Sequence, residues 1–261
     1  MDQVVSCNIE DFIATLTIER ESALNALNEA ALNQLREHIG QLAEKSFAEV
    51  RVVVLKGAGE KAFVAGADIK LMQQASEADL RRFIALGQEV MSGLEQLRQP
   101  VVAAVQGFAI GGGMELALAA DIIVASKKAK FGQAETNLGL IPGFGGTQRL
   151  ALRSGIGSAR ALIFGAETIS AEEAHRLHIV DYLVEPDELD WKVAQVVSNL
   201  LAKGPLAISA AKRAIQHPFR QTLSEGLENE VEEFVSLFGF SDTKEGLNAF
   251  VEKRKPQFRG E

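Results

Sequence analysis

The chain has 261 residues, and its 27 Lys and Arg against 35 Asp and Glu give a formal net charge of −8. This acidic balance argues against a broad surface for nucleic acids or anionic membranes, because both need clustered positive charge. Apolar residues make up 47% and charged residues 24% of the chain, a globular composition that excludes a large disordered fraction. The single cysteine, Cys7, excludes an internal disulfide and a cysteine-rich zinc site, so we expect no metal centre.

The N-terminal segment has neither the basic and apolar regions of a signal peptide nor the arginines of a transit peptide. The longest weakly charged stretch, residues 99–120, contains Pro100, four glycines and Glu115. It is too interrupted to span a bilayer. We therefore expect a soluble cytoplasmic protein of enzyme size, without a membrane partner.

The first half of the chain alternates between two kinds of pattern. Short apolar runs bounded by charge, Gly or Pro predict buried strands at residues 12–18, 50–55, 101–105 and 122–125. Between them, apolar residues spaced by three and four predict helices at residues 29–45 and 78–99. This alternation indicates an α/β fold.

After about residue 145, helical patterns dominate. They cover residues 146–154, 159–164, 171–177, 188–203, 205–215, 223–238 and 244–255, with one further strand at residues 179–184. No Pro-, Ser- or Gly-rich linker separates the two halves. We therefore predict one continuous domain with an α/β core over residues 1–190 and a helical C-terminal region over residues 191–261. Apolar faces in that region, at Val193, Val196, Val197, Leu200, Phe234, Leu237 and Phe238, suggest an assembly element.

Three consecutive glycines, Gly111–Gly113, open an apolar helix directly after a predicted buried strand. Such a run permits close approach of the backbone, and a helix N-terminus presents unpaired N–H groups that can receive an oxyanion. Tight packing of helix on sheet would explain the glycines equally well. Glu115 is the only charged residue between Arg98 and Asp121. Burial should raise its pKa, as at many active sites, unless the carboxylate bonds a distant Arg or a backbone N–H.

Two further segments carry candidate chemistry. Residues 57–70 follow a predicted strand, and their small residues would let a ligand lie against the backbone, although an ordinary loop fits as well. Residues 131–146 contain one acid, Glu135, twenty residues after Glu115. By itself Glu135 is typical of a solvated loop. If the fold brings the two carboxylates together, burial and repulsion would separate their titrations into acid and base roles.

Taken together, six segments resemble the enoyl-CoA hydratase, or crotonase, family. They are residues 23–27, 61–70, 111–117, 131–135, 141–150 and 245–256. The resemblance runs through nearly the whole chain in the right order. It implies a core of repeated ββα units and a helical C-terminal region that builds a homotrimer, usually paired into a homohexamer. It also implies an acyl-CoA substrate and no cofactor, because coenzyme A is part of the substrate.

The same resemblance assigns roles to individual residues. The thioester carbonyl would lie between the backbone N–H groups of Ala67 and Gly112. Glu115 would activate a water for attack on Cβ and Glu135 would protonate Cα, although the reverse assignment stays open. Positions matching substrate contacts of the family are Ala23, Leu24, Ala65, Asp68, Ile69, Lys70, Gly143, Phe234 and Lys253, the last two often serving a neighbouring subunit.

Two positions depart from the family pattern: Ala134 stands where many relatives have Pro, and Glu21 follows Arg20 where many have Pro. Neither departure removes a functional group. The presence of both glutamates favours hydration over double-bond isomerisation. The alternatives are an isomerase, a decarboxylase, a methylglutaconyl-CoA hydratase or a non-catalytic acyl-CoA-binding protein. RNA binding, known in one branch, is disfavoured by a pI of about 5.2.

Overall fold

The structure, a computed structural model, describes residues 3–68, 73, 75–215 and 222–261. In this part of the chain, the strands form one six-stranded and one four-stranded sheet. The larger sheet has the order β1-β2-β3-β5-β7-β10, in which β1 and β2 are antiparallel and the other neighbours are parallel. Its strands are β1 (Val5–Glu10), β2 (Ile13–Ile18), β3 (Val52–Gly57), β5 (Val101–Val105), β7 (Ile122–Ser126) and β10 (Tyr182–Val184).

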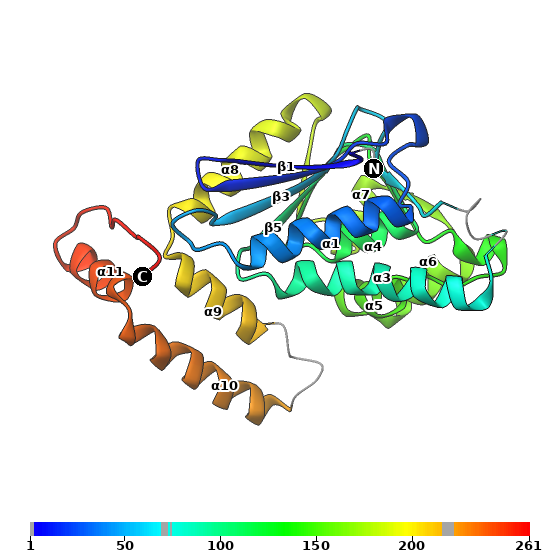
Figure 1. Cartoon of the computed structure of the whole chain (residues 1–261). Helices are drawn as coiled ribbons and strands as arrows, with labels where there is room; N and C mark the ends of the chain where they lie inside the picture. Colours follow the sequence, from blue (N-terminus) through cyan, green and yellow to red (C-terminus); the bar gives the residue numbers. More distant parts are fainter. Residues whose placement is uncertain (1–2, 69–72, 74, 216–221) are drawn as a thin grey trace.

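Both faces of the larger sheet are covered. Alternate residues of β3, such as Val53 and Leu55, face a core that includes α1 (Glu29–Ala43), α3 (Glu77–Gln96) and α4 (Gly112–Leu118). The intervening Val52 and Val54 pack with α8 (Leu189–Leu201) on the other face (Figure 1). Burial on both faces explains why these strands read as continuous apolar runs in the sequence.

The smaller sheet is built from short strands that the sequence patterns did not predict. Its order is β4-β6-β8-β9, with β8 and β9 antiparallel and the other neighbours parallel. The strands are β4 (Ala62–Ala65), β6 (Phe108–Ile110), β8 (Lys130–Gly132) and β9 (Thr168–Ser170). Each of β3, β5 and β7 is thus followed by a strand of the second sheet and then a helix, which is the ββα repeat that the resemblance implied. The β6–α4 junction brings the glycine run to the interface of the two sheets.

The remaining elements follow in chain order. They are α5 (Gly146–Ser154), α6 (Ile156–Gly165), α7 (Ala171–Arg176), α9 (Pro205–Ile215), α10 (Leu223–Ser236) and α11 (Ser241–Val251), with 3-10 turns η1 (Glu21–Ala23), η2 (Glu135–Leu138), η3 (Pro186–Glu188) and η4 (Leu237–Gly239). The sequence-predicted helices all lie on observed ones. Ser170 caps α7 by accepting a 3.2 Å bond from the Glu173 N–H.

The C-terminal helices α10 and α11 project from the core, with α9 between them and the sheets (Figure 1). Here one expectation is wrong. Val193, Val196 and Val197 do not offer a face for assembly, because α8 buries them on the sheet of its own chain. Phe234 and Phe238, in contrast, are 63% and 52% exposed.

Two polar contacts tie this C-terminal region to the core. The buried Lys212 of α9 reaches Asp121 at 2.7 Å and the carbonyl of Gln99 at 3.1 Å. Near the end of the chain, the carbonyl of Phe258 accepts a 3.0 Å bond from Arg51. Within the described ranges, we find no helix with the length and apolar character needed to cross a membrane.

Candidate active site

The N-terminus of α4 is shaped by its glycines. Gly111, the residue before the helix, has φ +53°, a left-handed conformation that glycine adopts without strain. A Cβ on Gly113 would lie 1.8 Å from the carbonyl oxygen of Val64, so only glycine lets α4 lie this close to β4. The packing explanation for the glycines is therefore correct. The same packing places the first turn of α4 beside the segment that follows β4.

Two backbone amides lie close to one another at this junction. Leu27 and Ala67 form a parallel bridge in which Leu27 donates to the carbonyl of Gly66 and the Asp68 N–H donates to Leu27. The N–H of Ala67, between those bonds, has no acceptor among the described residues, nor has the N–H of Gly112. A Cβ on Gly112 would lie 3.6 Å from the Ala67 nitrogen. The two predicted oxyanion-hole residues are thus neighbours in space.

Glu115 lies in the first turn of α4 and is only 1% exposed. Its Oε1 accepts bonds from the backbone N–H groups of Phe144, at 2.8 Å, and Gly146, at 2.7 Å. Burial is the main cause that raises the pKa of Glu115 to about 7; the nearby charge of Glu135 acts in the same direction, and the bonds from Gly146 and Phe144 oppose it. Backbone N–H groups do bond the Glu115 carboxylate, which was the alternative considered from the sequence. Its pKa is nevertheless raised to near neutrality.

Glu135, the first residue of η2, lies on the other side of the glycine run. Its Oε1 is 2.7 Å from the position of a Cβ on Gly111. Burial raises the pKa of Glu135 above its ordinary value. With its amide nitrogen facing Glu135, the buried Gln133 side chain donates to that carboxylate at 3.1 and 3.3 Å. The fold therefore brings together two carboxylates whose pKa values are both raised.

Several of the predicted substrate-contact residues are linked to one another by hydrogen bonds or lie side by side in the chain. Leu24 and Ala65 are joined by a 3.0 Å bond from the Ala65 N–H to the Leu24 carbonyl. Ala23 and Leu24 are exposed beside them. Asp68 pairs with Arg20 at 3.5 Å, and Arg20 also donates to the carbonyl of Ala26. Ile69 and Lys70 lie outside the described residues.

Backbone groups of the loop before α5 bond two different side chains. The Gly143 carbonyl accepts a 2.9 Å bond from the Gln88 side chain. The amides that reach Glu115 belong to Phe144 and Gly146.

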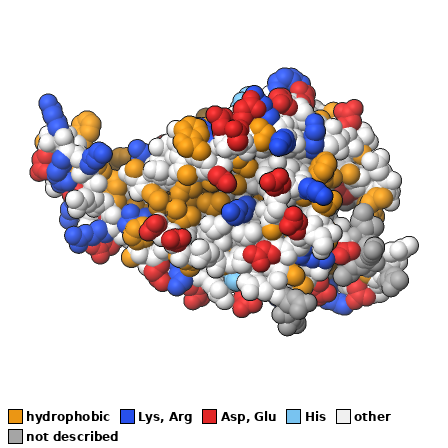
Figure 2. All heavy atoms as spheres, turned by 90° about the horizontal axis from the view of Figure 1, so that it is seen from above, with side chains coloured by type: hydrophobic (Ala, Val, Ile, Leu, Met, Phe, Trp, Pro, Cys, Tyr) orange, Lys and Arg blue, Asp and Glu red, His pale blue; other side chains and the backbone are white. Residues whose placement is uncertain are grey.

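Phe234 and Lys253 are not brought to the acids within one chain. Phe234 lies on α10, where its ring is 5.6 Å from that of Phe238. Lys253 follows α11, at the opposite end of the molecule from η2 and α6 (Figure 1). Figure 2 shows Lys and Arg side chains gathered on this projecting end. Any contact of Lys253 with the substrate would have to be made in a second copy of the chain.

Sequence reasoning missed three residues that shape the site. The backbone donors of Phe144 and Gly146 have no signature in the letters of a sequence, because every residue but proline has an N–H. Gln133 lies two residues before Glu135 in the chain, but no sequence pattern indicates that it is buried. A signal for Phe144 existed in α3: a Cβ on Gly87 would lie 2.1 Å from the Phe144 ring, so this mid-helix glycine makes room for it. The ring also meets Phe83 edge-on at 5.5 Å.

Comparison with known proteins agrees with this geometry. Residues 8–261 match the family described as enoyl-CoA hydratase/isomerase. The chain is 44% identical to a short-chain-enoyl-CoA hydratase of Clostridium acetobutylicum over 94% of both proteins. It is 42% identical to a crotonyl-CoA hydratase of Syntrophomonas wolfei over 95% of both. A crystal structure of an enoyl-CoA hydratase from Bacillus anthracis superimposes with a TM-score of 0.95 at 39% identity, covering 99% of this chain and 100% of that one.

The chain belongs to the enoyl-CoA hydratase/isomerase family. The resemblance, the crotonase-type α/β fold and the enzyme class predicted from the sequence are confirmed, and the protein is a hydro-lyase of the enoyl-CoA hydratase type. Among the residues that the structure describes, no group of three or more His, Cys, Asp or Glu is placed to hold a metal ion.

Proposed function

We propose that this enzyme adds water reversibly to short-chain trans-2-enoyl-CoA, using Glu115 and Glu135 on the substrate side of an oxyanion hole formed by Ala67 and Gly112. The observation that carries the proposal is the placement of two carboxylates with raised pKa values beside two backbone amides that have no acceptor in the described part of the chain. Each group has a task in adding water across a double bond conjugated to a thioester.

The amides of Ala67 and Gly112 act on the thioester carbonyl. When a nucleophile adds to Cβ, electron density moves through Cα to the carbonyl oxygen, which becomes an enolate oxygen. Donors fixed in advance by the Leu27–Ala67 bridge and by α4 stabilise that charge as it develops. Such a donor is worth about 3 kcal/mol of barrier. These two amides accelerate the reaction, and do not only bind the substrate, because they bind the enolate more tightly than the ground-state carbonyl.

The two acids handle the protons. Among the described residues, both hydrogen bonds to Glu115 end on Oε1, and Oε2 takes a proton from the attacking water. The water oxygen bonds to Cβ, and Glu135, protonated at the start, gives its proton to Cα. The proton collected by Glu115 must then return to Glu135 before the next turnover. We assign the roles in this order because Glu115 has two backbone donors that favour its ionised form, although burial outweighs them in its pKa.

We take the preference for short acyl chains from the relatives, since the two most similar ones described above are named for short-chain enoyl-CoA and crotonyl-CoA. The proposed chemistry needs no cofactor beyond the coenzyme A of the substrate, because both proton transfers and the charge stabilisation are assigned to the chain itself.

The test is the loss of absorbance of the conjugated enoyl thioester across a series of chain lengths, with the 3-hydroxyacyl-CoA product identified by mass. We expect the highest kcat/KM with the four-carbon substrate. A parallel assay with a 3-enoyl-CoA measures the competing isomerase reaction as a gain of the same absorbance. Isomerisation faster than hydration would contradict the proposal, and so would a kcat/KM that rises steadily with chain length.

We also propose that the chain works as a homotrimer, alone or paired into a homohexamer. Two apolar surfaces of the folded chain support this. One lies along α10, where Leu227, Val231 and Phe234 are exposed, and the other on α5 and α6 at Leu152, Ile156 and Phe164. Such surfaces commonly mark protein interfaces. A second copy would also bring Lys253 within reach of a substrate that its own chain cannot contact.

Light scattering tests the assembly by comparing the full chain with one that ends at Ile215. We expect the full chain to have three or six times the protomer mass and the shortened chain to have a smaller mass. A folded shortened chain that keeps the full oligomeric state would show that α10 and α11 are not the assembly element.

A further inference from the structure

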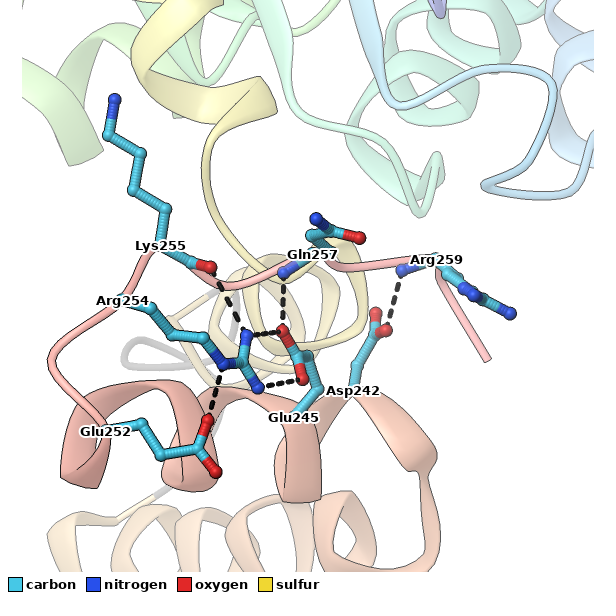
Figure 3. A network of polar contacts seen from close by, with 7 residues as sticks. All are labelled: Asp242, Glu245, Glu252, Arg254, Lys255, Gln257 and Arg259. Atoms are coloured by element: carbon cyan, nitrogen blue, oxygen red, sulfur yellow. Dashed lines mark hydrogen bonds and ion pairs between the residues drawn. The ribbon is translucent and has the colours of Figure 1, made fainter.

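Arg254, three residues after the end of α11, is held by two glutamates. Its Nη1 and Nη2 donate to the two carboxylate oxygens of Glu245 at 2.6 and 2.8 Å, and its Nε donates to Glu252 at 2.6 Å (Figure 3). The planar guanidinium matches a carboxylate in two parallel bonds, a geometry that lysine cannot reproduce. The pair holds the pKa of Glu245 at about 2, so the contact is ionic throughout the physiological range.

The same cluster fixes the backbone on both sides of Arg254. Glu245 also accepts a 2.8 Å bond from the Gln257 N–H, and Arg254 Nη1 donates to the carbonyl of Lys255 at 3.3 Å. Lys253 has φ +56°, a left-handed conformation that is unusual for a residue with a side chain. The N–H groups of Lys253 and Arg254 close this turn by donating to the carbonyls of Phe250 and Ala249 at the end of α11, and the cluster holds the chain beyond it.

The turn leaves the two neighbouring lysines with a different role. Lys253 and Lys255 are exposed, and Figure 3 shows the Lys255 side chain extending away from the cluster. Arg254, in contrast, has each of its three guanidinium nitrogens engaged with Glu245 or Glu252. Of three consecutive cations, the middle one is thus committed to the protein, and the outer two can bind a ligand.

We propose that Arg254 is a positioning residue that, through Glu245, presents Lys253 and Lys255 as a pair of ammonium groups to the phosphate groups of the coenzyme A substrate. This inference rests on the proposed function, in which Lys253 meets the substrate of a neighbouring copy. It adds Lys255 as a second contact and explains why Arg254 lies between them without being a ligand. The enzyme carries a net charge of −8, so its polyanionic substrate needs local cations held in place rather than long-range attraction.

The experiment compares two substrates in the full-length enzyme. Crotonyl-CoA carries the phosphates, and crotonyl-pantetheine has the same reacting thioester without them. For Glu245→Gln and Arg254→Lys we expect KM for crotonyl-CoA to rise roughly 5- to 20-fold, the range of a lost charge-assisted contact. We expect kcat, and every parameter with crotonyl-pantetheine, to stay unchanged, because a phosphate contact is equal in ground and transition states.

Glu245→Gln separates this proposal from the simpler one in which Arg254 itself binds phosphate. The substitution removes a negative charge and frees the guanidinium, so a phosphate-binding Arg254 would give a lower or equal KM. A higher KM supports positioning, and a lower or equal KM overturns it. Glu44→Gln, at an exposed acid at the end of α1, removes the same charge without touching the cluster and measures the electrostatic background.

Lys253→Met and Lys255→Met separate failure of the inference from failure of the proposed function. If Lys253→Met leaves KM for crotonyl-CoA unchanged, the assignment of Lys253 to coenzyme A is wrong. If Lys253→Met raises KM while Glu245→Gln and Arg254→Lys do not, the contact is real and the positioning role is wrong. An unchanged KM in Lys255→Met overturns the second contact. Melting temperatures of all variants identify any that are unfolded, and Arg254→Met then serves as a second variant at that position.

Discussion

The backbone N–H of Gly146 donates a 2.7 Å bond to Oε1 of Glu115, which ties the first turn of α5 to the first turn of α4. A Cβ on Gly146 would lie 3.0 Å from that carboxylate oxygen and 2.5 Å from the Gln133 side chain. The position is thus restricted to glycine by the Gln133 side chain and by the acid that its N–H holds. One oxygen of Glu115 is fixed by the protein, and the other is available for chemistry.

Glu115 and Glu135 should behave as one catalytic unit. We expect Glu115→Gln and Glu135→Gln each to lower kcat roughly 10²- to 10⁴-fold, the usual contribution of a positioned acid or base. The double variant should lose far less than the product of the two single losses, because either change already breaks the proton cycle. Steady-state hydration of crotonyl-CoA measures all three. Near-native turnover in either single variant would refute the assignment.

The activity should decline in acid with the titration of Glu115. Its pKa is raised to about 7, chiefly by burial. Only the ionised carboxylate can accept a proton from water, so kcat/KM should fall about tenfold per pH unit below that value. The apparent pKa will belong to the coupled pair of acids rather than to Glu115 alone. A profile of kcat/KM that stays flat down to about pH 5 would exclude Glu115 as the base.

The same raised pKa should cost stability. Because the folded pKa of about 7 exceeds the ordinary value of 4.5 for a glutamate, the folded state binds the proton more tightly than the unfolded state. Below about pH 4.5 Glu115 is therefore neutral and does not lower the free energy of unfolding. As the pH rises to about 7, its destabilising contribution grows. The full penalty is on the order of 3 kcal/mol.

Glu115→Gln keeps an oxygen acceptor and removes this charge. We expect the variant to melt at a higher temperature than the native enzyme at about pH 8, with the difference shrinking toward about pH 5. Thermal unfolding at both pH values decides the matter, and a variant less stable at the higher pH would contradict the sign. Activity and stability would then oppose one another at a single side chain.

Gly112→Val should impair turnover more than binding. The added Cβ would lie 3.2 Å from the Phe144 ring and 3.6 Å from the Ala67 nitrogen, in the space between the two proposed donors. We expect kcat to fall about 10²-fold, since the lost bond strengthens as the enolate forms. Gly40→Val in α1 is the matched control, because a Cβ there meets no atom within 4 Å. A change confined to KM in a folded Gly112→Val enzyme would make the helix N-terminus a packing device only.

Lys212→Met should loosen the C-terminal region. The Lys212 side chain is 7% exposed and pairs with Asp121 at 2.7 Å, and Asp121 also accepts from the Val101 N–H at 2.7 Å. Removing the cation leaves a largely buried carboxylate without its partner, a loss on the order of 3 kcal/mol. Urea unfolding measures the loss. Restoration by the additional change Asp121→Asn would identify the unpaired charge as its cause, and its absence would point to lost packing instead.

The larger sheet could be predicted from the sequence because its inner strands are runs of β-branched residues such as Val52–Val54 and Val101–Val102, buried on both faces. The smaller sheet could not. Its strands are three or four residues long and adjoin glycines needed for close approach, as at Gly107, where a Cβ would lie 2.1 Å from the Lys61 carbonyl. Strands this short show no alternation of apolar and polar residues, so the sequence predicts loops at these positions. The edge strand β1 was missed because Ser6, Asn8 and Glu10 make it polar.

Some residues of the candidate site could likewise be predicted from the sequence, and others could not. Glu115 could be identified from the sequence, since a lone acid in an apolar helix conflicts with its surroundings. Glu135 needed the family resemblance, because its burial depends on residues far away in the chain. The partners of Glu115 are backbone groups of Phe144 and Gly146, whose positions follow from tertiary structure and not from residue type.

The packing of Phe144 against Gly87 predicts that these two positions vary together among related enzymes. Its ring occupies the space where a side chain at Gly87 would be, and its N–H holds Glu115 at 2.8 Å. A larger residue at the α3 position would push the ring, and the amide with it, away from the acid. Related enzymes that acquire a side chain where this chain has Gly87 should therefore carry a smaller residue in place of Phe144, so that two positions 57 residues apart, 144 minus 87, covary across the family.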